Sequence, residues 1–440
     1  MGQRVVIGVG PDALRAAAVL STAGHAVTLL QAGPGASGLV HPDLPQNTGR
    51  MRTSDEVRSV AEQVFGPLVE APGIGRGIQL AGRTWHLPLR RRDAPVFGPA
   101  AWRLPLAMGL IQARKELRSS ELSGTGKEER SYRDWVVRRM GEPAWRLLLQ
   151  PWASRRWGVP AEQLGAALAR HHHAIADRGP HQVAGGRSQV SLEAAEQAIL
   201  ASGGQVRSGV RVEGIELKGD RVASVRLAGG EQVPVEGPLW VARGPATVLS
   251  WLPEPLREPL ERDAEGLVSA DLLVLCLKGE VDGLPEELHV LDKDAPFWGV
   301  ISPYGIKEYA LFLSTLRADQ PTPDLDGLAR ESAEAARRLG IGSFSDQEPR
   351  LERLVEFQPA WTQGAHARFH RLVNLFEDHG IVLVGRTGAF SPLDAGGEVE
   401  LALALRDQDR PDLRGVLRRI ADPPARLDDL RVSLRPFIQQ

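Results

Sequence analysis

The sequence predicts an α/β protein built around a Rossmann-type unit, and three observations support this fold class. Residues 4–32 have the pattern of a buried strand, a glycine turn, an Ala- and Leu-rich helix and a second strand. The turn places small residues, Gly8, Gly10 and Ala13, in the G-x-G-x-x-A spacing of a dinucleotide-binding βαβ unit. A second strand that ends in glycine, residues 380–386, occurs near the other end of the chain.

Each small residue of the first turn has a physical role in this spacing. Gly8 permits the sharp turn, Gly10 lets the backbone approach a pyrophosphate, and Ala13 lets the helix lie close to the strand. The free N–H groups of the helix N-terminus would face the phosphates. However, Gln31 stands where an acidic residue would hold ribose hydroxyls, and Asp12 adds negative charge where phosphate would bind. The unit therefore predicts the fold and leaves open whether a dinucleotide binds.

Composition narrows the class of protein. The 440 residues, 42% hydrophobic and 25% charged, are typical of a globular protein of two or three domains. A net charge of −2 gives no general attraction to nucleic acid. The single cysteine, Cys276, excludes an internal disulfide and is expected to be a buried strand thiol. With a first strand that starts at residue 4 and no apolar stretch of about 20 residues, we expect a cytoplasmic protein without a signal peptide.

Other elements follow from local patterns. Residues 77–88 alternate like a β-hairpin that turns at Ala81-Gly82-Arg83. Ser131, with Asp134 three residues on, is expected to begin a helix. The remaining expectations are strands at 269–277, 309–315 and 350–357 and helices at 325–339 and 367–377.

A helix expected at residues 99–118 has a broad apolar surface and ends in Arg114, Lys115 and Arg118. It could pack on its own domain, or lie on a membrane surface or a partner. The run His171-His172-His173 does not predict a metal site, because adjacent helical side chains point about 100° apart.

The C-terminal strand leads into a second glycine-rich helix start. Gly385-Arg386 ends the strand, residues 387–390 are expected to form a loop, and Gly396-Gly397-Glu398-Val399 opens the next helix. This arrangement again exposes backbone N–H groups at a helix N-terminus. We therefore expect the two ends of the chain to fold into one domain.

The ordered set of motifs resembles the flavin-containing amine oxidase and protoporphyrinogen oxidase superfamily, and looks closest to its UDP-galactopyranose mutase-like branch. Pro11 after Gly10 is flavoprotein-like, and Gly385-Arg386 is similar to the family's G-R or G-D. The other similar segments are Gly82–Pro88, Tyr132–Trp135, Trp157–Pro160, Gly185–Ser188 and the valine pattern Val206, Val212, Ile215.

The resemblance implies an FAD-type Rossmann (GR2-like) domain, with an inserted mixed-sheet substrate domain and a helical cap. The boundaries would be 1–72, 185–245 and 372–415 for the FAD domain, 73–98 and 246–371 for the substrate domain, 99–184 for the cap and 416–440 for a tail. The implied cofactor-binding residues are Gly8, Gly10, Pro11, Ala13, Gln31, Gly38, Val212, Gly385, Arg386, Gly396, Gly397, Glu398 and Val399.

Several family motifs are altered, so FAD could be retained or lost. Gln31 stands in place of the acidic residue that binds the ribose, and Gly38-Leu39-Val40 stands in place of the family's G-G-R. The segment near Thr48-Gly49-Arg50 departs from the family's D-x-G-x-H. Pro392–Gly396 replaces Y-x-N-M-D. Each lost hydrogen bond to a polar cofactor group would cost about 1.5–3 kcal/mol.

Two functions remain open at this stage. One is an FAD-dependent oxidoreductase acting on an unidentified small organic substrate, and the other is a non-catalytic relative with a degenerate FAD site that acts as a partner or scaffold protein. A NAD(P)-dependent sugar-nucleotide enzyme fits the flavin-like motifs less well. No catalytic residue is assigned, since His86, Arg386 and Asp394 are each better explained as structural. Expected partners are a small-molecule substrate and a second copy or paralogue, with no nucleic acid, and peripheral membrane contact stays open.

Overall fold

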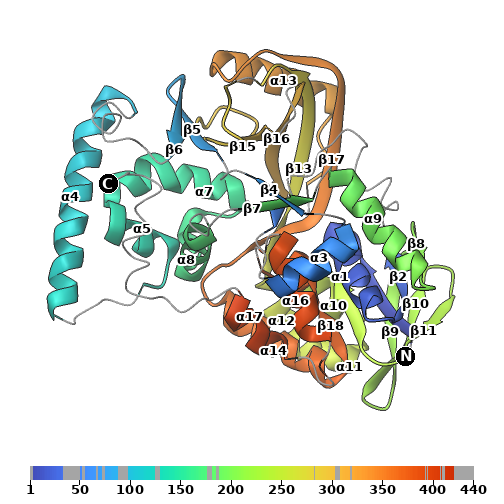
Figure 1. Cartoon of the computed structure of the whole chain (residues 1–440). Helices are drawn as coiled ribbons and strands as arrows, with labels where there is room; N and C mark the ends of the chain where they lie inside the picture. The colour runs from blue at the N-terminus through green and yellow to red at the C-terminus, as the bar shows by residue number, and fades with distance from the viewer. Residues whose placement is uncertain are drawn as a thin grey trace.

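A computed structural model of the 440-residue chain reveals the architecture (Figure 1). It describes residues 3–32, 50–51, 55–65, 68–71, 75–87, 98–123, 129–175, 181–184, 188–281, 283–302, 308–317, 320–391, 393, 395–406, 408 and 412–420. Within these residues the strands form four sheets.

The first sheet is parallel and draws its strands from distant parts of the chain. Its order is β18 (Ile381–Leu383), β12 (Leu239–Ala242), β1 (Gln3–Gly8), β2 (Ala26–Gln31) and β8 (Gln205–Arg207). These strands read as nearly continuous apolar runs because helices cover them. Helices α1 (Pro11–Thr22) and α9 (Ser188–Ala201) contact these strands directly. Outside them, α3 (Asp55–Phe65) and α16 (Ala395–Arg406) pack on α1, and α17 (Leu413–Ile420) packs on α16. Figure 1 shows α1 and α16, coloured blue and red, side by side.

Two small sheets accompany the parallel one. The antiparallel strands β9 (Val212–Lys218), β10 (Arg221–Leu227) and β11 (Gln232–Pro234) form a meander beside it. The other small sheet joins β3 (Arg50–Met51), β7 (His181–Ala184) and β4 (Leu68–Ala71).

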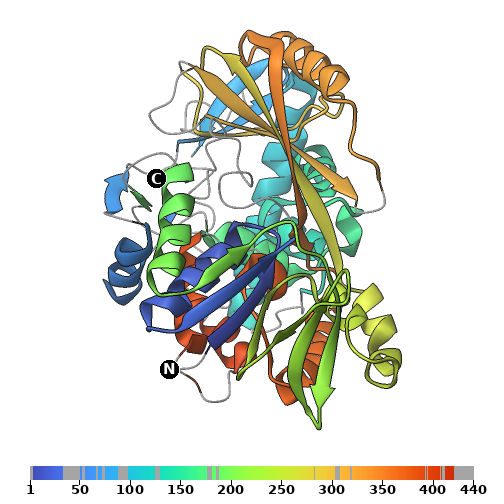
Figure 2. The ribbon, with the colours of Figure 1, turned by 90° about the vertical axis from the view of Figure 1, so that its right-hand side faces the viewer.

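A seven-stranded mixed sheet forms the opposite end of the molecule (Figure 2). Its order is β17 (Phe344–Ala360), β13 (Val268–Gly279), β16 (Tyr309–Arg317), β15 (Gly299–Ile301), β14 (Glu287–Val290), β5 (Arg76–Leu80) and β6 (Arg83–Leu87). Helix α13 (Leu325–Arg338) covers one face with a separate core of Phe297, Phe312 and Phe344. Leu272, Val274 and Cys276 belong to the main core on the other face.

Helices link the two large sheets. On one side lie α4 (Ala100–Ser123), α5 (Tyr132–Met140), α6 (Glu142–Ala144), the π-helix η3 (Trp145–Leu149), α7 (Gln150–Trp157), the 3₁₀ helix η4 (Ala161–Gln163) and α8 (Ala166–Ile175). On the other lie α10 (Pro245–Ser250), α11 (Glu254–Arg257), the 3₁₀ helix η5 (Glu258–Leu260), α12 (Glu261–Glu265) and α14 (Ala365–Asp378). None of the helices that the structure describes is long and apolar enough to cross a membrane.

Several local predictions are confirmed. The hairpin turns at Ala81 and Gly82, both with positive φ, as a type I′ hairpin turn requires. Ser131 and Asp134 form a reciprocal capping box at the start of α5. Cys276 lies in β13 with 6% of its surface exposed.

Two expectations need correction. Residues 387–390 were expected to form a loop, but Gly385–Gly388 is a short helix, α15, because the Thr387 N–H finds an acceptor in Asp12. The strand expected at 350–357 extends over Phe344–Ala360, since it pairs with β13 along most of its length.

One carboxyl group in the long strand β17, that of Glu352, has no opposing charge beside it among the described residues. Glu352 lies opposite Val274 in the β13–β17 ladder and therefore shares the sheet face that holds the main core. Burial raises the pKa of Glu352 to about 8 from its ordinary 4.5.

We expect Glu352→Gln to stabilise the protein at alkaline pH. Between pH 4.5 and about 8 the unfolded chain ionises Glu352 while the folded chain keeps it protonated, so stability falls as pH rises through this window. The amide removes that loss, and we expect a gain of about 1–3 kcal/mol above the window and almost none below it. Thermal unfolding over a pH series measures the difference, with the exposed Glu331→Gln as control. A gain independent of pH would contradict the assignment.

Candidate functional site

The first glycine turn has the close packing that its sequence predicts. A Cβ atom added to Gly8 would lie 2.2 Å from the Cβ of Ala13, so only glycine here allows α1 to lie against β1. Gly10 precedes the helix in an extended conformation, and Pro11 occupies its first turn. The helix N-terminus is thus fixed directly at the end of β1.

The Asp12 carboxylate lies where the two glycine turns meet. Its Oδ1 accepts a hydrogen bond from the Ala13 N–H at 2.9 Å, and its Oδ2 accepts one from the Thr387 N–H at 3.2 Å. A Cβ atom on Gly385, which has a φ of +70°, would lie 2.6 Å from Asp12 Oδ2. The turns at the two ends of the chain therefore meet, as the sequence predicts, and both contact the buried Asp12 carboxylate, which the sequence does not predict.

The buried environment of Asp12 disfavours the ionised form of its carboxyl group. Its side chain is almost fully buried, and burial raises the pKa of this carboxyl while the N–H groups of Thr387 and Ala13 oppose the shift. Two backbone donors that could bind a phosphate oxygen are thus occupied by a carboxylate of the chain itself.

A second buried charge cluster joins α1 to α16. Arg15 Nη1 and Glu398 Oε2 are 2.5 Å apart, with 4% and 3% of their side chains exposed. Arg386 Nε lies 3.7 Å from the other oxygen of Glu398. Burial raises the pKa of Glu398, and the two arginines oppose this shift. The acid in the first turn of α16 is therefore neutralised by residues of α1 and α15.

Gln31 marks the other end of the predicted cofactor site. It is fully buried at the end of β2, and neither its side-chain oxygen nor its nitrogen has a hydrogen-bond partner among the described residues. Its backbone oxygen accepts from the Val210 N–H at 3.0 Å, which places Val212 two residues beyond this contact. Gly38 lies outside the described residues.

These observations test whether an adenine dinucleotide fits. The buried amide of Gln31 suits a ribose hydroxyl pair, and the convergent N–H groups suit a pyrophosphate, since they already bind an anion. The residues therefore fit FAD, with Asp12 as the one side chain that would compete with its phosphates. The individual cofactor-binding assignments remain predictions.

A cluster of arginine and tryptophan side chains lies between α7 and the mixed sheet. The Arg156 guanidinium lies over the rings of Trp152, Trp157 and Trp298, 4.8–5.5 Å from their centroids. Its Nη1 is 3.9 Å from Glu287 Oε1, and its Nε and Nη1 make no hydrogen bond to a described residue. Burial lowers the pKa of Arg156, and the positive charge of Arg386 adds to this lowering.

Two ionisable groups in this cluster have shifted pKa values. Burial opposes ionisation of Glu287, but Arg76, His289 and Arg156 outweigh it and lower the pKa to about 2. Arg76 Nε donates to this carboxylate at 3.0 Å. Burial lowers the pKa of His289 to about 4, against the attraction of Glu287. At neutral pH the cluster thus contains one carboxylate, a neutral imidazole and an excess of guanidinium charge.

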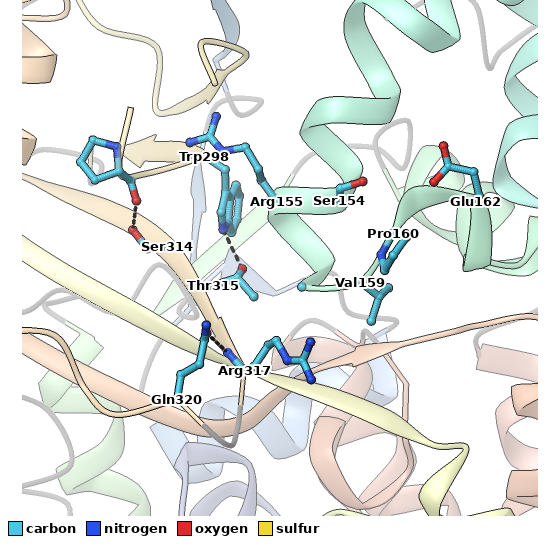
Figure 3. Close-up of a pocket in the computed structure, with 12 residues that line it drawn as sticks. Ser154, Arg155, Val159, Pro160, Glu162, Trp298, Ser314, Thr315, Arg317 and Gln320 are labelled. Atoms are coloured by element: carbon cyan, nitrogen blue, oxygen red, sulfur yellow. Dashed lines mark hydrogen bonds between the residues drawn. The ribbon is translucent and has the colours of Figure 1, made fainter. Parts of the chain in front are cut away.

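A pocket of about 550 Å³ adjoins the cluster, between the α7–η4 segment, residues 296–298 before β15, and strand β16 (Figure 3). Its polar wall groups are bonded to one another. The Trp298 indole donates to Thr315, Ser314 donates to the Pro296 carbonyl, and Gln320 accepts from the Arg317 N–H. These hydrogen bonds fix part of the pocket wall, and the charged residues Arg155, Glu162 and Arg317 also line it.

The remaining sequence candidates have ordinary surroundings. His86 is exposed in β6, and Arg386 lies over the Phe357 ring at 4.4 Å. Asp394 and the side chains of His171, His172 and His173 lie outside the described residues. The side chains that are described contain no cluster of His, Cys, Asp or Glu suited to a metal ion.

The sequence indicated where the two glycine turns lie, but it did not indicate which distant side chains contact them. It noted the charge of Asp12 but not its contact with Thr387, and it overlooked Arg15 and Arg156. The available signals were an arginine within the Ala-rich helix of residues 11–22 and one between tryptophans 152 and 157.

The fold is similar to solved structures over most of the chain, although the sequence matches no family model and no curated protein. Reduced UDP-galactopyranose mutase shares 13% identity, with 99% of each chain covered and a TM-score of 0.70. A protein assigned as a protoporphyrinogen oxidase from Exiguobacterium shares 14%, over 91% of this chain and 98% of that one, with a TM-score of 0.64. A putrescine oxidase with redesigned cofactor binding shares 13%, over 92% and 98%, with a TM-score of 0.58.

These likenesses establish the fold. The predicted Rossmann-type α/β class and the resemblance to the flavin amine oxidase superfamily are confirmed at that level. The domain boundaries remain predictions.

We expect that removing one member of the buried Arg15–Glu398 pair destabilises the protein more than replacing both members with apolar side chains does. Glu398→Leu leaves Arg15 buried without its partner and should lower the free energy of unfolding by about 3–5 kcal/mol. Arg15→Met should cost less, because Arg386 remains 3.7 Å from Glu398. The double variant should be more stable than the sum of the single losses predicts.

Denaturant unfolding measures these differences. The exposed pair Arg257–Glu261, replaced in the same way, should change stability by less than about 1 kcal/mol. Additive losses in the double variant would show that the two side chains do not act as a pair.

Proposed function

We propose that the protein is an FAD-dependent oxidoreductase of the amine oxidase and protoporphyrinogen oxidase type, acting on a small organic substrate. One observation carries the proposal: backbone N–H groups from the two glycine turns converge on a single buried anion. Such a convergence of helix N-termini is suited to a pyrophosphate. The similarity of fold to a protoporphyrinogen oxidase and a putrescine oxidase is consistent with it.

In this proposal three groups of residues each bind a different part of FAD. The turns at Gly8–Ala13 and Gly385–Thr387 hold the pyrophosphate, Gln31 and Val212 hold the adenosine, and the α16 N-terminus at Gly396–Val399 lies by the flavin ring. FAD, when bound, supplies the electron acceptor. The helix N-terminus favours negative charge near the ring. Arg156 and its surrounding tryptophans form part of the wall on the substrate side and exclude water from it.

A second candidate function is a non-catalytic relative that acts as a partner or scaffold, and one observation favours it. The anion at the convergence point is Asp12, which takes two of the donors a phosphate needs. A carboxylate about 5 Å from a phosphate charge would oppose it by about 3 kcal/mol at an effective dielectric constant of 20. That opposition corresponds to about a hundredfold loss of affinity.

Substitution of Asp12 separates the two functions. We expect the wild-type protein to bind FAD and to bind it more tightly as pH falls, because burial already raises the pKa of Asp12 and protonation removes its charge. Asp12→Ser should raise the affinity at least about tenfold and reduce the pH dependence. Calorimetric titration with FAD, together with the yellow colour of bound oxidised flavin, measures both effects.

The matched control is Asp326→Ser. Asp326 is an exposed acid and the second residue of α13, as Asp12 is the second residue of α1. This substitution should leave FAD binding unchanged. FAD binding by the Asp12→Ser variant alone would support the non-catalytic relative with a self-occupied site. If neither protein binds FAD, the oxidoreductase proposal is wrong.

A further inference from the structure

Helix α4 has apolar side chains on two opposite faces, and only one of them packs against the protein. At about 100° per residue, Trp102, Leu106, Gly109 and Ala113 fall on one face. Trp102 and Leu106 contact the small core that contains Trp85 and Leu148. A Cβ atom on Gly109 would lie 2.8 Å from Pro143 Cδ, so the helix lies tightly against the start of α6.

The opposite face carries a stripe of exposed apolar residues. Leu104, Met108 and Ile111 are 67%, 61% and 67% exposed, and their spacing of four and three residues aligns them along the helix. The stripe runs for about 10 Å at 1.5 Å per residue. Figure 1 shows α4 at the outer edge of the molecule, beside α5, so the stripe lies on a protruding edge.

Basic residues continue this stripe toward the C-terminal end of α4. Lys115 and Arg118 fall on the same face as Leu104 and Ile111, and Arg114 lies at its border. All three are exposed, and none forms an ion pair or hydrogen bond with a residue that the structure describes. The acidic Glu116 lies well away from this face and accepts a hydrogen bond from Gln112.

We propose that this face of α4 docks on the surface of a membrane that contains anionic lipids. An exposed apolar stripe enters the boundary between headgroups and acyl chains, and cations next to it bind lipid phosphates. Lys115 and Arg118, which have no ion-pair partner among the described residues, match an anionic surface, while an apolar partner protein would leave them without counter-charge. The helix lies on the bilayer and does not cross it. This inference does not depend on the cofactor.

Co-sedimentation of the full chain with vesicles tests the proposal. The wild-type protein should bind vesicles of phosphatidylcholine with a minority of phosphatidylglycerol, bind pure phosphatidylcholine weakly, and be released by high salt. The variant with Leu104→Ser, Met108→Ser and Ile111→Ser should lose at least about tenfold in binding to the anionic vesicles. Because these side chains are exposed, its thermal unfolding should match the wild type.

Two further variants separate the contributions. Lys115→Gln with Arg118→Gln should weaken binding several-fold on anionic vesicles only and reduce its salt dependence. The matched control, Leu200→Ser with Val355→Ser, replaces exposed apolar residues on other elements and should bind like the wild type. Failure of the wild type to bind anionic vesicles, or equal losses in this control, would overturn the proposal. A dimer that the triple variant dissociates, without any lipid binding, would assign the face to a second copy instead.

Discussion

The structure depends on one hydrogen-bonding requirement, which is that the first turns of α1 and α15 need an acceptor between them. Peptide N–H groups at both helix starts point into a space that side chains close off from water. A space there without an acceptor would leave buried donors unsatisfied. Asp12 meets the requirement from within the chain, and it links residue 12 to residue 387 in doing so. Under the proposed function the phosphates of FAD would lie in the same space, so structural stability and cofactor binding would draw on the same donors.

The buried charges around this point follow a common pattern. Arg15, Glu398 and Arg386 neutralise one another across three helices, and Arg76 pairs with Glu287 in the mixed sheet. Arg156 differs, because aromatic rings surround it and its nearest carboxylate already has a closer partner. Pairs of this kind add little net stability when compared with apolar side chains, but they penalise any other register of the helices that they join. We infer that they fix how α1, α15 and α16 meet.

Features that depend on a few consecutive residues could be predicted from the sequence, and contacts between residues far apart in the chain could not. Gly8 and Ala13, the hairpin at Ala81-Gly82 and the capping box at Ser131 each follow from steric or hydrogen-bonding rules over a few residues. Arg15 and Glu398 are 383 residues apart, and nothing near either residue specifies the other. The short helix at Gly385–Gly388 was not predicted for the same reason, since the acceptor that stabilises it lies at the opposite end of the chain. The resemblance to known families supplied the order of the motifs, while the contact of Asp12 with Thr387 required the coordinates.

The strand order of the parallel sheet has a consequence for biosynthesis. Strand β1 pairs with β12, which in turn pairs with β18, so neighbours in the sheet are separated by more than a hundred residues of chain. As the polypeptide leaves the ribosome, β1 and β2 form early but have no partner on one side until residues 239–242 appear, and β12 waits for residues 381–383. Nascent chains therefore expose an apolar strand edge for most of their translation, which makes chaperone engagement and the pace of elongation determinants of the yield of native protein.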